Sequence, residues 1–206
     1  MLAPVSASVL MKILYGARAA RWDILKIAQL FASRVTKWSR DCGKALHRLV
    51  CYIQCTHDWV LRGFIGDPPS ALRLHLYADA DFAGDRPGFK STSGCFLALS
   101  GPNTCFPLAA KSQRQTAVAH STPEAEIVSA NHAVRTVGIP SLDLWEGILQ
   151  RAVVLLLLED NESTYQIIKN WTKSHNATHL SDSWSERVLV ARSVLKRVIR
   201  DDVYQN

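Results

Sequence analysis

The apolar positions in the first third of the chain recur at helical spacing. Between residues 22 and 35 they come at intervals of three and four, at Ile24, Ile27, Ala28, Phe31 and Val35. A second helix is predicted after Asp41, an acceptable N-cap, with an apolar side formed by Leu46, Leu49, Val50 and Ile53. The segment Gly-Asp-Pro-Pro-Ser at residues 66–70 ends this pattern. We therefore predict a helical segment over residues 1–68 and a second domain over residues 69–206.

The hydrophobic period changes to two after this boundary. In residues 72–81 the apolar positions Leu72, Leu74, Leu76 and Ala78 alternate with polar ones, which predicts a strand with one buried face. Asp79 and Asp81 share the other face. Further strands are predicted at residues 93–99 and 105–110, separated by a Gly-Pro-Asn turn. The pattern therefore favours three antiparallel strands in succession.

Helical and parallel-strand signals follow. In Thr122-Pro-Glu-Ala-Glu126, the threonine can cap a helix, the proline suits the first helical position, and the acids suit the positive end of the helix dipole. This helix is predicted to run to about residue 137. The apolar run 153–158 predicts a central strand covered on both faces, followed by a short helix through residue 168. Helical character is predicted again at residues 187–199. Because the second domain combines these strands and helices, we expect it to belong to the α/β class.

Composition limits the class of protein further. The 206 residues are 48% hydrophobic and 20% charged, which excludes a disordered or collagen-like chain. The longest strongly apolar run is too short to cross a bilayer, and the first residues lack a secretory signal, so we expect an intracellular protein with no membrane partner. Five cysteines without a CxxC pair argue against a disulfide framework or a zinc ribbon.

The basic charge is confined to the N-terminal part. Residues 1–75 hold eleven Lys and Arg against four Asp and Glu, whereas residues 76–206 hold thirteen against fourteen. Such a segment can attract the phosphates of a nucleic acid, but a solvated basic helix face explains the same charge.

Three carboxylates occur where predicted elements begin or end. Asp79 ends the first predicted strand, Asp160 follows the buried later one, and Glu126 lies in the first turns of the intervening helix. If the two strands are neighbours, the three carboxylates converge, and a hard cation such as Mg²⁺ or Mn²⁺ would then offset their repulsion. Taken singly, each has another explanation, as a strand end, a dipole partner or a helix cap.

Several short blocks, in order, resemble one family. They are Tyr77-Ala-Asp-Ala-Asp-Phe-Ala-Gly-Asp85, Lys90-Ser-Thr-Ser-Gly94, Ala110-Lys-Ser-Gln-Arg-Gln115, His120-Ser-Thr-Pro-Glu-Ala-Glu126 and Glu159-Asp-Asn-Glu-Ser-Thr164. Together they resemble the ribonuclease H domain of copia-type retrotransposon polyproteins. Upstream, residues 14–24 and 49–60 resemble the tail of the adjoining reverse transcriptase.

The resemblance implies a ribonuclease H-like mixed five-stranded sheet flanked by helices. It also implies an endonuclease that cleaves the RNA strand of RNA–DNA hybrids with two Mg²⁺ or Mn²⁺ ions held by Asp79, Glu126 and Asp160. The implied partner is the reverse-transcriptase portion of the same polyprotein, and the implied location is the cytoplasm or a virus-like particle. The catalytic aspartates of the polymerase fall in none of this sequence.

One block of the family is missing. Its fourth carboxylate normally lies near the domain's end, in a block resembling Ala-Asp-Ile-Leu-Thr-Lys, and here only Asp182, Asp201 and Asp202 can stand in for it. We therefore expect a C-terminally truncated or divergent domain in which the last strand can be missing. This leaves open whether the chain is an active hydrolase, and the alternative is a degenerate copy that binds nucleic acid with weak cleavage or none.

Overall fold

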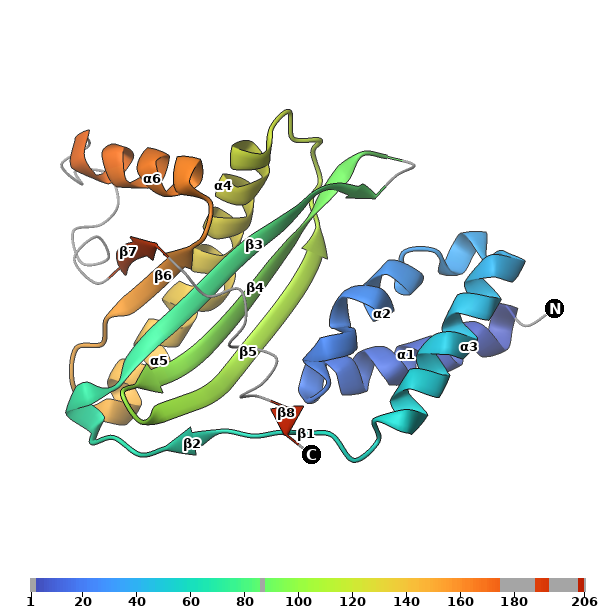
Figure 1. Cartoon of the computed structure of the whole chain (residues 1–206), viewed down its shortest axis with the longest axis horizontal. Coiled ribbons are helices and arrows are strands. Elements are labelled where there is room, and N and C mark those ends of the chain that lie inside the picture. The colour runs from blue at the N-terminus through green and yellow to red at the C-terminus, as the bar shows by residue number, and fades with distance from the viewer. Residues whose placement is uncertain (1–2, 86–87, 175–187, 193–203, 206) are drawn as a thin grey trace. The chain divides into compact units, whose positions relative to one another are not determined.

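The computed structural model describes residues 3–85, 88–174, 188–192 and 204–205. The chain forms two compact units that divide between Arg62 and Gly63 (Figure 1). This division falls a little before the boundary predicted at residue 69. The reason is that Phe64–Ile65 already pairs with the sheet of the second unit as strand β2.

The first unit is helical, as predicted. It contains α1 (Ala3–Ala19), η1 (Trp22–Ile24), α2 (Leu25–Ala32), η2 (Val35–Lys37) and α3 (Arg40–Cys55), followed by β1 (Val60–Leu61), which pairs antiparallel with β8 (Tyr204–Gln205). The N-cap of α3 is Ser39 and not Asp41, because the Ser39 Oγ accepts a hydrogen bond from the Cys42 N–H at 3.1 Å. The predicted apolar stripes are buried at Ile24, Ala28, Phe31, Leu46 and Leu49.

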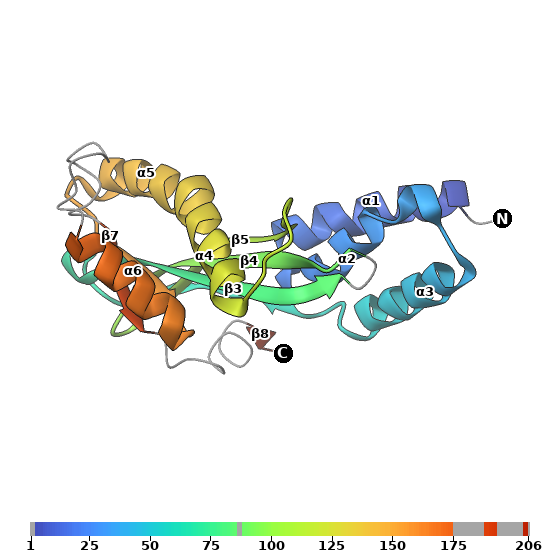
Figure 2. The same cartoon turned by 90° about the horizontal axis from the view of Figure 1, so that it is seen from above.

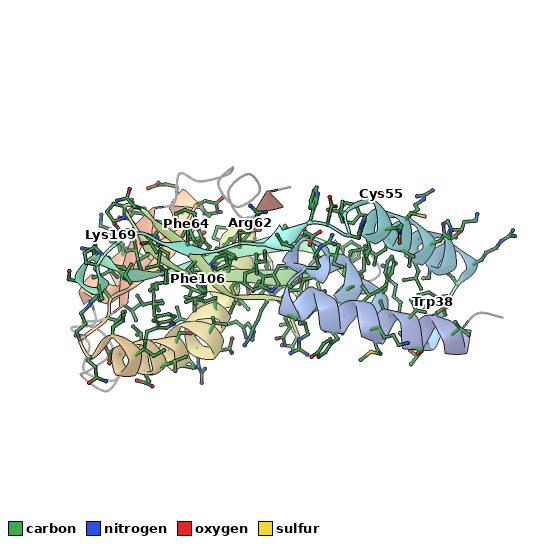
Figure 3. All side chains as sticks on the ribbon, turned by 90° about the horizontal axis from the view of Figure 1, so that it is seen from below. Trp38, Cys55, Arg62, Phe64, Phe106 and Lys169 are labelled. Carbon is green, nitrogen blue, oxygen red and sulfur yellow. The ribbon has the colours of Figure 1, made fainter. Side chains whose placement is uncertain are left out.

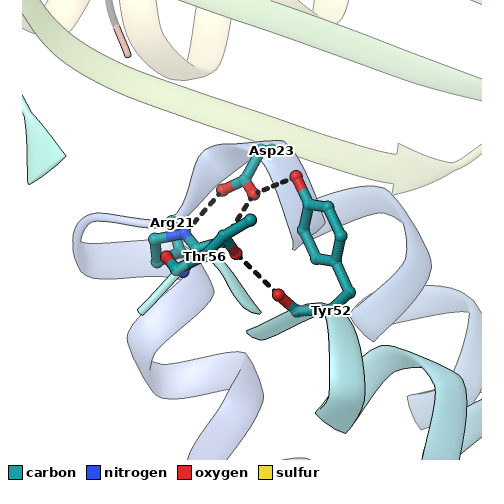
Figure 4. A network of polar contacts seen from close by, with 4 residues as sticks. All are labelled: Arg21, Asp23, Tyr52 and Thr56. Carbon is teal, nitrogen blue, oxygen red and sulfur yellow. Dashed lines mark hydrogen bonds and ion pairs between the residues drawn. The ribbon is translucent and has the colours of Figure 1, made fainter. Parts of the chain in front are cut away.

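A polar network joins the start of η1 to the end of α3 (Figure 4). The Arg21 guanidinium donates to both carboxylate oxygens of Asp23, at 3.0 and 2.8 Å, and to the carbonyl and hydroxyl oxygens of Thr56, at 2.9 and 2.7 Å. The Tyr52 hydroxyl donates to the same Asp23 carboxylate at 3.1 Å. Because the Arg21 and Asp23 side chains are only 14% and 13% exposed, this ion pair is shielded from solvent.

The second unit is built on a six-stranded sheet (Figures 1 and 2). Its elements are β2 (Phe64–Ile65), η3 (Pro69–Ala71), β3 (Arg73–Asp85), β4 (Lys90–Gly101), β5 (Thr104–Arg114), α4 (Thr122–Ala133), η4 (Val134–Gly138), α5 (Ile139–Leu149), β6 (Leu155–Glu159), α6 (Glu162–Ser174) and β7 (Val188–Arg192). The strand order is β2-β5-β4-β3-β6-β7. Neighbouring strands from β2 to β3 are antiparallel, whereas β3–β6 and β6–β7 are parallel.

The core lies between the sheet and the helices α4 and α5, which share one face of it (Figure 2). Leu74, Leu76 and Ala78 of β3 project into this core, as the alternating pattern predicted. The helical path bends at the π-turn η4, where Gly138 lies so close to the sheet that an added Cβ would be 2.6 Å from the Leu155 Cδ2. The predicted single helix thus continues as α5.

The two edge strands of the sheet correct two expectations. The strand that could be missing is present as β7, and it occupies residues that we predicted to be helical. Parallel pairing with β6 stabilises it, from Leu155↔Val188 to Glu159↔Arg192. The sheet also has six strands and not five, because β2 adds an outer edge on β5, where the side chains of Phe64 and Phe106 are exposed (Figure 3). No helix in the described part of the chain is long and apolar enough to span a membrane.

Candidate metal centre

Asp79 and Asp160 converge because β3 and β6 stop pairing just before them. The parallel ladder runs from Leu74↔Leu155 to Tyr77↔Leu158. Asp79 lies two residues after Tyr77, and Asp160 two residues after Leu158, so the alternation of side chains directs both from the same face. Asp79 is not at the end of its strand, as the sequence suggested, since β3 continues beside β4 to Asp85. It marks the end of the β3–β6 ladder.

Beyond the last pair, Tyr77↔Leu158, strands β3 and β6 separate, and we call this place the β3–β6 fork. Helix α4 brings the third carboxylate to this fork. Its N-cap is Ser121 and not Thr122, since the Ser121 Oγ accepts from the Glu124 N–H at 3.3 Å. About two turns into the helix, the Ser129 hydroxyl donates to the backbone carbonyl of Asp79 at 2.7 Å. Small side chains at Ala80, Ala119 and Ala125 pack together beside it. These contacts hold the first turns of α4, and with them Glu126, against the strand that carries Asp79.

The three predicted site residues are brought together. One carboxylate oxygen from each of Asp79, Glu126 and Asp160 lies within 4.8 Å of the other two. Asp79 and Asp160 are exposed, whereas Glu126 is 4% exposed. Hence the geometric expectation from the sequence is correct, and the roles of these residues stay predictions.

The electrostatics of Glu126 suit a bound cation. Burial, and then the charges of Asp79, Glu159 and Asp160, raise the pKa of Glu126 from 4.5 to about 8, while a hydrogen bond from the Ala80 N–H acts in the opposite direction. The Glu126 Oε2 is buried and has no hydrogen-bond partner among the described residues. Clustered carboxylate oxygens are the donors that Mg²⁺ and Mn²⁺ prefer, so the residues present fit a hard divalent cation.

Glu124, the other acid in this helix turn, does not face the fork. Its Oε2 accepts a hydrogen bond from the backbone N–H of His120 at 2.7 Å, and its side chain is exposed. Residues two positions apart in an α-helix differ by about 200° in direction, so Glu124 and Glu126 face opposite sides. The choice of Glu126 over Glu124 made from the sequence therefore agrees with the geometry.

Sequence reasoning missed Glu159, the last residue of β6. Its side chain is 0% exposed, and burial together with the charges of Asp160 and Asp79 raises its pKa from 4.5 to about 7. The Glu159 Oε1 accepts from the Asn161 N–H at 3.1 Å, and the Oε2 has no partner in the part of the chain described. A glutamate that ends an apolar run looks like a solvated boundary, so the one available signal was its place directly before Asp160.

Other charged residues on strands β4 and β5 have structural partners. Arg114 forms an ion pair with Asp85 at 2.7 Å, and Lys111 donates to the Thr136 carbonyl oxygen at 3.1 Å. Lys90 donates to the Thr116 carbonyl oxygen. Asp81 is not part of the carboxylate group. The possible fourth ligands Asp182, Asp201 and Asp202 lie outside the described residues.

Two known proteins of Arabidopsis thaliana are similar to part of this chain. The retrovirus-related Pol polyprotein from transposon RE2 is 35% identical over 86 residues, which are 42% of this chain. The corresponding polyprotein from transposon RE1 is 34% identical over 83 residues, or 40% of this chain. The match spans 5% of the length of each polyprotein. No protein-family model matches the chain.

Among solved structures, the crystal structure of RNase H1 from the halophilic archaeon Halobacterium salinarum NRC-1 resembles this chain with a TM-score of 0.34 and 13% identity. The match covers 59% of this chain and 85% of that one. Within the six-stranded sheet, strands β5-β4-β3-β6-β7 have the mixed five-stranded arrangement that the family resemblance implied. In it β5, β4 and β3 are antiparallel neighbours, and β6 and β7 continue parallel to β3. Over part of its length this chain is thus similar to the retrovirus-related Pol polyproteins of transposons RE1 and RE2, and its sheet unit has the mixed strand pairing that the resemblance to a ribonuclease H domain implied.

Proposed function

We propose that this chain is a metal-dependent endonuclease that cleaves the RNA strand of RNA–DNA hybrids during reverse transcription of a retrotransposon. The observation that carries the proposal is the meeting of Asp79, Glu126 and Asp160 within 4.8 Å at the β3–β6 fork. Two of these carboxylates are open to solvent and can face a phosphodiester, while the third is buried behind them. Such a cluster suits hard divalent cations, and two-metal hydrolysis of a phosphodiester uses them.

Each carboxylate has a distinct role in this proposal. Asp79 and Asp160, on neighbouring parallel strands, hold Mg²⁺ or Mn²⁺ directly. Glu126, fixed by α4, binds one ion from the buried side and orients the scissile phosphate. When bound, a pair of divalent ions lowers the pKa of an attacking water and stabilises the leaving oxygen. The protein contributes the fixed positions of the three carboxylates.

The helical unit has a separate part in the proposal. We assign residues 1–68 to the tail of the reverse transcriptase and propose that the polymerase portion of the same polyprotein is the partner of this domain. The site of action would then be the cytoplasm or a virus-like particle.

The proposal is tested by incubating the purified full chain with a hybrid whose RNA strand is labelled. We expect cleavage that requires Mg²⁺ or Mn²⁺, that stops on chelation, and that spares single-stranded RNA and both strands of duplex DNA. Asp79→Asn and Asp160→Asn should lower the rate by at least about a hundredfold, because losing a ligand misplaces the reacting groups. Cleavage that persists in both variants would show that another site, or a contaminant, is responsible.

A second candidate function is hybrid binding with weak cleavage or none. It is favoured by the composition of the centre, which has three carboxylates within the described residues and no unambiguous counterpart of the family's fourth. Hybrid binding in the presence of Mg²⁺, without turnover over hours, would favour this candidate.

A further inference from the structure

Asp160 lies in a short connection that is restrained on both sides. On the sheet side, the Oε1 of Glu159 accepts from the Asn161 N–H at 3.1 Å. On the helix side, the Asn161 Oδ1 accepts from the Thr164 N–H at 3.0 Å and thereby caps α6. Asp160 itself is exposed. The hydrogen bonds made by the Glu159 and Asn161 side chains hold the backbone around Asp160, and this backbone sets the direction of its carboxylate.

The carboxylate of Glu159 is costly for the fold. It is completely buried at the end of a strand whose residues Leu155 and Leu157 belong to the hydrophobic core. One of its oxygens has no hydrogen-bond partner in the described part of the chain. The nearby carboxylates of Asp160 and Asp79 also disfavour a negative charge on it. Burying a carboxyl group without full hydrogen bonding destabilises a protein, and an apolar residue at the same position would not carry that cost. Stability alone thus gives no reason for a glutamate here.

We propose that Glu159 is a positioning residue for Asp160. By accepting the Asn161 N–H, it fixes the turn between β6 and α6, and this holds the Asp160 carboxylate within reach of Asp79 and Glu126. The inference rests on the proposed function, because Asp160 needs a fixed position only if it binds a cation. The hydrogen bond requires an acceptor and not a charge, so a carboxamide at the same position preserves it.

The test compares Glu159→Gln, which retains the acceptor, with Glu159→Met, which has a similar length and lacks it. Glu162→Gln is the matched control, because it neutralises a nearby exposed acid of α6 whose Oε1 accepts a hydrogen bond from the Gln166 side chain within the helix. For each full-length variant, we would measure Mn²⁺ affinity by calorimetry and the exchange rate of the Asn161 amide by NMR. Neither measurement depends on hybrid cleavage.

We expect Glu159→Gln and Glu162→Gln to resemble the wild type in both measurements. Glu159→Met should bind Mn²⁺ about 10–100-fold more weakly, the usual effect of losing a group that orients a metal ligand. Its Asn161 amide should exchange about tenfold faster, because one hydrogen bond is lost. Its melting temperature should equal or exceed that of the wild type, since the buried Glu159 carboxylate is removed, and this separates positioning from a merely structural role.

Two results would overturn the inference. If Glu159→Met bound Mn²⁺ as tightly as the wild type, the hydrogen bond would not position Asp160. If Glu159→Gln were as impaired as Glu159→Met, charge and not hydrogen bonding would be responsible. Should Glu159→Met fail to fold, Glu159→Leu provides the same comparison. The predicted Mn²⁺ pattern without any hybrid cleavage would refute the proposed function alone, whereas cleavage with equal Mn²⁺ affinities would refute this inference alone.

Discussion

Asp79 and Asp160 leave the same face of the sheet, each two residues after the last pair of the parallel β3–β6 ladder. The fork between the two strands is open beyond Tyr77 and Leu158, and Glu126 enters it from α4. Glu126 and Glu159 are buried there with oxygens that lack partners among the described residues, and burial together with the neighbouring acids raises the pKa of both. The first predictions follow from this arrangement.

Substituting Glu126 should affect catalysis, and substituting its neighbour Glu124 should not. We expect Glu126→Gln to lower the rate of Mg²⁺-dependent hybrid cleavage by at least about a hundredfold, since the geometry at the fork changes. Glu124→Gln retains an acceptor for the His120 N–H and should leave the rate within a factor of a few of the wild type. Loss of cleavage in Glu124→Gln alone would mean that the wrong glutamate is assigned to the fork.

The metal-free chain should lose stability as the pH rises from about 4.5 to about 8. Glu126 and Glu159 have pKa values raised to about 8 and about 7, so between these values and 4.5 the folded chain binds more protons than the unfolded chain. Their contribution to stability is full below pH 4.5 and is lost as the pH passes through the raised values. Urea unfolding at several pH values would measure this decline.

Divalent cations and neutral substitutions provide the control for this pH dependence. Saturating Mg²⁺ should reduce the decline, because a bound cation favours the ionised carboxylates. Glu126→Gln should reduce it too. A metal-free chain whose stability rises from pH 5 to pH 8 in parallel with that of Glu126→Gln would contradict the account.

The polar network of the helical unit should contribute to stability through Arg21. Replacing Arg21 with Met removes its ion pair with Asp23 and both bonds to Thr56, which should cost about 2 kcal/mol or more. Tyr52→Phe removes one bond to Asp23 and should cost about 1 kcal/mol. Lys44→Met is the control, because Lys44 is exposed in its ion pair with Asp41. Chemical unfolding curves should rank the variants in this order, and equal midpoints for all three would refute it.

The missing family block leads to a prediction about rate. We expect the chain to cleave hybrids weakly, since a second ion normally needs a fourth ligand and no described residue supplies one. A version extended by a segment containing Ala-Asp-Ile-Leu-Thr-Lys should cleave about a hundredfold faster. Equally robust, magnesium-dependent cleavage by both versions would show that the chain already contains the ligand, with Asp182, Asp201 and Asp202 as the candidates.

Local sequence patterns were sufficient for much of the fold. The alternation from Leu72 to Ala78 predicted the buried face of β3, and the apolar run before Asp160 predicted a central parallel strand, which is β6. Strand β7 could not be predicted in this way, because a short apolar run such as Val188–Arg192 suits a helix or a strand, and its pairing with β6 decides. The caps were wrong by one or two residues, since Ser39 and Ser121 compete with Asp41 and Thr122 as equally suitable caps.

The candidate site was predictable only in part. Three acids at the ends of predicted elements indicated a cluster, and the family blocks selected the same three. Glu159 was missed because its burial depends on how α6 packs against β6 and α4, which no local pattern records. The extension of β3 to Asp85 was missed because its pairing with β4 there passes through a register shift between Asp81 and Asp85, which an alternating pattern does not reveal.

The most direct test of the central claim is anomalous diffraction at the manganese edge from crystals of the full chain grown with Mn²⁺. We predict anomalous density at the β3–β6 fork, within bonding distance of the carboxylates of Asp79, Glu126 and Asp160, and its absence in crystals of Asp160→Asn. No manganese at the fork at saturating Mn²⁺, or manganese bound only elsewhere, would contradict the account.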